Sequence, residues 1–401
     1  MRATQFGWRR KCVSMVRSRF AAAGAVAAAL YVQAICGGWV PASAASRPLA
    51  RIRLERDIRV RALRILRPVA SNRLFAIHDG AVGVLSPLTL GMTDTCGTTW
   101  TKILGRHRRR ASARATAFAA EPSFSPDGSR FVALAFSGTG GSRPMGAGLK
   151  ARWQIWSFGK KKPLSTLHTG TLGPLPIPPR GPQRLLYVDG GRKLVGFGGG
   201  AIYFFSAKTS QLLFSPAPLI SYHIVRLQSE PKGPLLAAYC TMPRRIEVWN
   251  SRSGKRVVVI APPAGTRWGP ATCYAIGGGR VAVAWGRHLA LYSAVDGRCL
   301  AEAGFPSQCY APAFTISGSA LAVCTADAPM VRNGTAGERN RATLRVWIFR
   351  VERKLVAAGR SVPFRCGTSG YRQLTWWGKH TLIFCSSRRA LRWQVSWKLR
   401  R

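Results

Sequence analysis

The sequence predicts an all-β protein built from repeated four-stranded antiparallel units, and three observations carry this prediction. First, 42 Gly and 25 Pro are spread along 401 residues, with short apolar runs between them. Second, an aromatic residue followed by a small or polar one recurs at intervals of roughly 43 to 55 residues. Third, a glycine turn and a short apolar strand precede each of these pairs. With 47% hydrophobic residues and 19% charged residues, the chain can bury a large core, which excludes a disordered chain.

The segment "EPSFSPDGSRFVALAF" (Glu121 to Phe136) predicts one hairpin of such a unit. Phe124 ends one strand and Phe131 begins the next. Between them, proline fixes φ, aspartate supplies a local hydrogen-bond acceptor, and glycine adopts positive φ without strain.

The repeat extends this hairpin to a whole architecture. The aromatic pairs are Trp156-Ser157, Phe205-Ser206, Trp249-Asn250, Tyr292-Ser293 and Trp347-Ile348. Adding one unit around Arg73 to Ser86 and one after His380 gives seven units. Repeats of about 40 to 45 residues with four strands each are typical of β-propeller blades. The last unit has only three strands, so we expect a strand between Ile52 and Leu66 to complete it and close the ring.

Two families share these motifs. Phe124 to Gly128 resembles the Phe-Ser-Pro-Asp-Gly repeat of TolB-type propellers, and the strands centred on Trp156, Trp249 and Trp347 look like WD-repeat blades. The resemblance covers about 350 residues and implies a binding or scaffolding propeller. Ser206, Asn250 and Ser293 are among the residues at the position of the WD aspartate.

The first 44 residues differ from the rest, which we assign to one propeller domain, residues 45–401. Basic residues precede a charge-free run from Phe20 to Val40, and Ala42-Ser43-Ala44 is a small-x-small cleavage site. This order indicates an export signal and an extracytoplasmic protein, periplasmic or secreted. An uncleaved membrane anchor and an organelle presequence are the alternatives.

Eight cysteines follow the leader, and an even number in an exported chain permits disulfides. Placing them at strand ends on the same mouth of the propeller predicts two hairpin bridges, Cys309–Cys324 and Cys366–Cys385. Cys240 and Cys273 form a third candidate pair across neighbouring blades, and Cys96 and Cys299 are expected to be unpaired. The alternative is that all eight are small buried hydrophobes.

The chain carries 61 Lys+Arg against 14 Asp+Glu, a formal net charge of +47. Such a field attracts polyanions, although a compositional bias toward arginine is an alternative source. The candidate polyanion contacts, on one face of the propeller, are Arg106, Arg108, Arg109, Arg110, Arg114, Arg244, Arg245, Arg388 and Arg389. Further clusters at Lys160 and Arg252 belong to the other face. This spread argues against a dedicated nucleic-acid site.

No motif for catalysis or cofactor binding stands out. The sequence has no Cys-x-x-Cys and no His-Glu-x-x-His, so it gives no support for zinc, and no cofactor or metal is expected. We therefore expect a non-catalytic binding or scaffolding module that meets a protein or an anionic envelope component, polymer or membrane surface. A propeller enzyme with a site at the channel mouth and an organelle-targeted propeller on RNA are the alternatives. Oligomeric state stays open.

Overall fold

The structure is a computed structural model of the chain. The residues that it describes are 40–41, 50–59, 64–66, 74–78, 81–85, 92–95, 123–125, 127–137, 150–157, 163–167, 185–198, 201–214, 217–218, 224–230, 232–269, 272–327, 341–352, 354–367, 372–386 and 389–397.

Within these residues the fold is all-β, and seven sheets each contain four antiparallel strands in a row. The first four sheets follow chain order. They are β3 (Arg64–Leu66), β4 (Leu74–His78), β5 (Ala81–Leu85) and β6 (Met92–Thr95); β7 (Ser123–Phe124), β8 (Arg130–Ser137), β9 (Lys150–Ser157) and β10 (Pro163–Thr166); β11 (Leu185–Val188), β12 (Lys193–Gly198), β13 (Ala201–Ser206) and β14 (Ala217–Pro218); and β15 (Ile224–Ser229), β16 (Leu235–Thr241), β17 (Arg244–Asn250) and β18 (Lys255–Ile260).

The other three sheets include additions from elsewhere in the chain. They are β19 (Cys273–Gly277), β20 (Arg280–Trp285), β21 (His288–Ser293) and β22 (Cys299–Gly304), with β1 (Val40–Pro41) parallel to β22; β23 (Gln308–Phe314), β24 (Ala320–Ala326), β25 (Arg341–Val351) and β26 (Leu355–Arg360), with β27 (Phe364–Gly367) on β25; and β28 (Arg372–Trp377), β29 (Thr381–Ser386) and β30 (Arg389–Trp397), with β2 (Ala50–Arg59).

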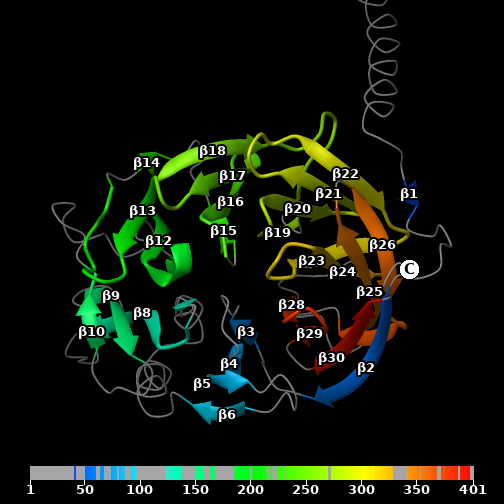
Figure 1. The fold of residues 1–401 in the computed structure, drawn as a ribbon, viewed down its shortest axis with the longest axis horizontal. Helices are drawn as coiled ribbons and strands as arrows, with labels where there is room; N and C mark the ends of the chain where they lie inside the picture. Colours follow the sequence, from blue (N-terminus) through cyan, green and yellow to red (C-terminus); the bar gives the residue numbers. More distant parts are fainter. Residues whose placement is uncertain are drawn as a thin grey trace, which may run out of the picture.

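The sheets lie in a ring, with β3, β15, β19, β23 and β28 toward its middle (Figure 1). In a ring each sheet has a neighbouring sheet on both faces, which explains why the strand sequences are apolar on both faces. All residues of β24 and β29 are buried, and these strands read as nearly continuous apolar runs. The buried clusters lie between consecutive sheets; one joins Val323 of β24 to Leu291 of β21, and the next joins Leu344 of β25 to Phe384 of β29.

The N-terminal strand closes the ring as expected. β2 pairs antiparallel with β30 from Ala50 opposite Trp397 to Arg59 opposite Arg389, so blue and red ribbons lie side by side in Figure 1. Ala50 is buried in the cluster shared with β25 and β29. The expected segment was too long, because its last residues, Arg64–Leu66, form β3 of a different sheet.

The hairpin that opens at Phe124 is present, and the structure contains a second turn of its kind. β7 and β8 pair through Phe124 and Phe131, as predicted. "FTISGSAL", residues 314–321, repeats its backbone hydrogen bonds between β23 and β24. In the two turns Ser125 N and Thr315 N donate to Arg130 O and Ala320 O, each at 2.9 Å, and Gly128 N and Gly318 N donate to Ser125 O and Thr315 O, each at 2.9 Å.

The aromatic-small pairs also have a structural role. In three of them, the small or polar residue accepts a backbone N–H from the turn that follows. The contacts are Thr209 N to Ser206 Oγ at 3.0 Å, Arg252 N to Asn250 Oδ1 at 2.9 Å and Val295 N to Ser293 Oγ at 3.3 Å. A short side chain with an acceptor oxygen is what such turns require.

The predicted disulfides are not formed. Seven cysteines are described, and none of them is in a disulfide bond: Cys240, Cys273, Cys299, Cys309, Cys324, Cys366 and Cys385. The Sγ of Cys299 donates to Oε1 of Glu302 at 3.6 Å, and Cys96 lies outside the described residues.

Alternation along the strands explains why the hairpin pairs do not meet. Cys309 is opposite Thr325, one residue past Cys324, so the two thiols lie on opposite faces of their sheet and join different clusters. Burial raises the pKa of Cys309 well above its ordinary value. A neutral buried thiol is a poor nucleophile for disulfide exchange.

The other two pairs fail for the same reason. Cys366 lies in β27, which pairs with β25, and belongs to the cluster that contains Phe384. Cys385 follows Phe384 and so faces away from that cluster. Cys240 likewise belongs to a cluster with Phe204, on the face of its sheet away from the sheet of Cys273.

Gly318 gives a test of how closely neighbouring sheets approach. Its φ is +72°, and a Cβ there would lie 2.5 Å from Cα of Gly278, in the turn of the neighbouring sheet. We expect Gly318→Ala to lose about 1–2 kcal/mol from backbone strain and about 1–3 kcal/mol more from this contact. Denaturant unfolding measures the loss.

Gly378→Ala is the matched control, because Gly378 has φ +66° and a Cβ there would meet nothing within 4 Å. It should show the strain alone. Equal losses in the two variants would mean that the two turns are not in contact.

Candidate functional site

The carboxylates contact their own chain wherever the structure describes their side chains. Each has a hydrogen bond or an ion pair within the molecule. These residues are Glu55, Asp57, Asp127, Asp189, Glu230, Glu247, Asp296, Glu302, Asp327 and Glu352. Acidic groups thus help to hold the fold, and the surplus of positive charge follows from their small number, 14 Asp+Glu against 61 Lys+Arg.

The described residues contain neither a group of metal ligands nor a membrane-spanning helix. No three of their His, Cys, Asp and Glu side chains are grouped so as to hold a metal ion. None of their helices is both long and apolar enough to cross a bilayer.

The candidate polyanion contacts have different surroundings from one another. Arg244, at the start of β17, is exposed. Arg245 is mostly buried, with Nε 3.5 Å from Oε1 of the fully buried Glu247. Arg389 Nε donates to Asp57 Oδ1 at 2.8 Å, which ties β30 to β2. The other six lie outside the described residues: Arg106, Arg108, Arg109, Arg110, Arg114 and Arg388.

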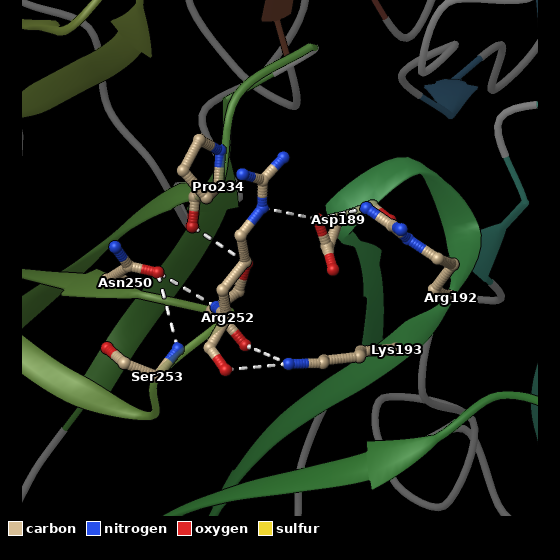
Figure 2. A network of polar contacts seen from close by, with 8 residues as sticks. Asp189, Arg192, Lys193, Pro234, Asn250, Arg252 and Ser253 are labelled. Atoms are coloured by element: carbon tan, nitrogen blue, oxygen red, sulfur yellow. Dashed lines mark hydrogen bonds and ion pairs between the residues drawn. The ribbon is translucent and has the colours of Figure 1, made fainter.

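A network that sequence analysis missed joins the β11–β14 sheet to the β15–β18 sheet (Figure 2). It centres on Asp189, in the short 3-10 turn Asp189–Gly191 between β11 and β12. Asp189 has φ +50°, which aspartate tolerates better than most residues. Its side chain is only 7% exposed.

Two arginines from neighbouring sheets meet at one oxygen of this carboxylate. Arg192 Nη2 and Arg252 Nε each donate to Asp189 Oδ1 at 3.0 Å. Arg192 Nε also donates to Asp189 O at 3.2 Å. The arginine side chains are 70% and 62% exposed, so each guanidinium is anchored at one edge and open to solvent at the other.

The turn that carries Arg252 is itself held in place. Lys193 Nζ donates to Ser251 O at 3.0 Å and to Arg252 O at 2.8 Å. Ser251 Oγ donates to Pro234 O at 2.7 Å, and Asn250 Oδ1 accepts the N–H of Arg252. Figure 2 shows Lys193 reaching across from β12 to this turn. The position of Arg252 is therefore set by bonds between the two sheets, and that of Arg192 by its bonds to Asp189 in its own turn.

Electrostatics agree with this geometry. Burial alone would raise the pKa of Asp189, but hydrogen bonds from Arg252 and Arg192 outweigh it and hold that pKa below its ordinary value. Burial, with the nearby arginine charges, lowers the pKa of Lys193 against the attraction of Asp189. At neutral pH the carboxylate is ionised.

The two halves of this network appear separately in the sequence. Gly190-Gly191 is the glycine turn that precedes the pair Phe205-Ser206, and Arg252 belongs to a basic cluster on the face opposite the candidate arginines. Nothing in the spacing of residues 63 apart, Asp189 and Arg252, showed that they touch. The sequence does contain one signal: an acidic residue, Asp189, between the first and second strands of one unit, and a basic residue, Arg252, between the third and fourth strands of the next unit.

Asp189→Asn tests the network. Asparagine keeps the shape and tolerates positive φ but lacks the charge. We expect a loss of about 1–2 kcal/mol in unfolding free energy at pH 7, since both arginines are largely exposed. Because the folded pKa of Asp189 is depressed, its contribution is complete above the unfolded pKa and disappears as pH falls through the folded pKa.

The difference between wild type and Asp189→Asn in urea unfolding should therefore shrink below about pH 4. Asp296→Asn is the control; Asp296 is exposed and accepts a backbone N–H from Arg298. It should have a smaller effect. A constant difference for Asp189→Asn from pH 7 to pH 3 would contradict the assignment.

Comparison with known proteins adds little to these observations. No family model and no curated protein matches the sequence. One similar solved structure is described as the crystal structure of the mitotic checkpoint complex. The identity is 14% and the TM-score 0.48, over 86% of this chain and 95% of that chain. The assignment of the fold therefore rests on the strand pairing and the ring of sheets.

Proposed function

We propose that the protein is an exported, non-catalytic seven-bladed β-propeller, WD-repeat-like in its blades, that binds a protein or an anionic component of the cell envelope. Each described sheet corresponds to one blade, and the β2–β30 pairing is the closure that such a ring needs. Closure of this kind removes a free sheet edge.

One observation supports an anionic partner above all. The described carboxylates are engaged within the molecule, whereas basic side chains such as Arg192, Arg244 and Arg252 are exposed. With 14 Asp+Glu against 61 Lys+Arg, the chain has few acidic groups to offset the positive field around it. Such a field raises the local concentration of anionic polymers and surfaces.

Salt dependence tests this part of the proposal. Binding to heparin should weaken steeply as salt rises, because each neutralised anion releases counterions. The triple replacement of Arg108, Arg109 and Arg110 by Glu should flatten that slope if the contacts lie there. Affinity measured at several salt concentrations gives the slope.

A charge-matched control is available on β2. Arg51, Arg53 and Arg56 are exposed on an outer strand, and their replacement by Glu changes the net charge equally. Equal effects of the two triple variants would point to overall charge rather than one contact face. Tight heparin binding that ignores salt would contradict electrostatic binding altogether.

Export has its own test. Residues 1–44 are proposed as a signal peptide, so N-terminal sequencing of the mature protein should begin at Ala45. Removal of this segment would remove β1, yet β19, β20, β21 and β22 still make a four-stranded sheet without it. Mature protein that retains its first residues would refute cleavage and favour an anchor.

A further inference from the structure

We propose that Arg192 and Arg252, oriented by Asp189, form a site for a phosphate monoester group. The inference rests on the proposed function, since it names one place and one chemistry for anion binding. It differs from the candidate arginines of the sequence, because it lies at the face where the β11–β12 and β17–β18 turns meet (Figure 2).

The argument begins with the donors that Asp189 leaves free. Arg252 gives only Nε to the carboxylate, and its two terminal nitrogens make no hydrogen bond with the described part of the chain. Arg192 gives Nε and Nη2, so Nη1 is free in the same sense. With side chains 62% and 70% exposed, these donors are accessible to a ligand.

Orientation is the second step. A free surface arginine loses side-chain entropy when it binds an anion, and this loss weakens binding. Here folding has already restricted these side chains, so less entropy is lost on binding. Asp189 holds both guanidiniums, and Lys193 fixes the turn of Arg252 through two carbonyl oxygens. Planar guanidinium groups are well suited to the oxygens of a phosphate.

Charge selects the ligand class. Arg192, Lys193 and Arg252 carry three positive charges, and Asp189 carries one negative charge, which leaves a local charge of about +2. A phosphate monoester at pH 7 carries a charge of about −1.5 to −2 and three acceptor oxygens. A diester or a carboxylate carries only a single negative charge, so the monoester matches the site best.

The experiment titrates the full protein with inorganic phosphate by calorimetry. Arg252→Lys keeps the charge but cannot bond Asp189 and also present a planar pair of donors, so we expect affinity to fall about tenfold. Arg192→Gln should weaken binding by at least as much. The matched control is Arg298→Lys, an exposed arginine in the equivalent turn of the neighbouring β19–β22 sheet, which should leave affinity unchanged.

Asp189→Asn separates orientation from charge. It makes the protein more positive, so a site that acted through net charge alone would bind phosphate more tightly. Loss of orientation predicts weaker phosphate binding, while heparin binding stays equal or increases. A melting curve of each variant shows that it is folded; Arg252→Lys leaves Asp189 in place and tests the site even if Asp189→Asn unfolds.

Vesicles distinguish the source of the phosphate. Phosphatidylcholine vesicles with phosphatidic acid present a monoester on a membrane, and those with phosphatidylglycerol present a diester. Phosphatidic-acid binding that falls in Arg252→Lys would place the monoester on a lipid, and an effect confined to inorganic phosphate would place it on a soluble ligand; both support the site.

Phosphate affinity unchanged in Arg252→Lys and Arg192→Gln would overturn the site. The proposed function would survive this result if wild-type heparin binding remained salt-dependent. Failure of the wild type to bind heparin, anionic vesicles or phosphate would overturn both the site and the anionic partner of the proposed function.

Discussion

Burial of both faces of a sheet, which is complete in β24 and β29, is the constraint on which the rest of the structure depends. A four-stranded sheet with two apolar faces is stable in water only between two neighbours, and each neighbour has the same need. A ring satisfies all of them at once. Each fully buried side chain such as Phe384 or Leu344 contributes about 1.5–3 kcal/mol, so an open end would be costly. The β2–β30 pairing follows directly from this constraint.

The same constraint sends charge to the turns. A sheet with neighbours on both faces has almost no place for an unpaired charge. The fully buried Glu247 is accordingly paired: Arg245 Nε lies 3.5 Å from its Oε1, and Arg256 Nη1 lies 3.8 Å from its Oε2. Other charges lie on outer strands such as β2 and in the turns where strands end. Neighbouring sheets approach closely at these ends, so turns far apart in sequence meet, and Asp189 reaches Arg252. A contact that stabilises the ring thereby also arranges exposed arginines.

Features of the fold that depend on residues close together in the sequence could be predicted, whereas features that depend on the pairing of distant residues could not. The hairpin at Phe124, the repeated turns and the incomplete last unit, which has three strands of its own and takes its fourth from β2, are patterns of the sequence that the structure contains. The disulfide pairs required a choice between the two faces of a strand. Cys309 and Cys324 flank one hairpin, but a difference of one residue in register separates their side chains. Turn length and strand ends do not fix that register.

The missed site has a further cause. Its residues come from two sheets, and the contact depends on how neighbouring sheets are rotated and offset, which no local pattern encodes. The number of basic residues alone does not predict an anion site, because some arginines of the chain pair with buried carboxylates and others remain exposed. Arg245 is mostly buried and pairs with the buried carboxylate of Glu247. Arg252 bonds Asp189 through Nε alone, and its side chain is largely exposed. The carboxylates of the fold decide which arginines keep donors free for a partner, so the placement of the few acids, more than the number of arginines, selects the site that we propose for an anion.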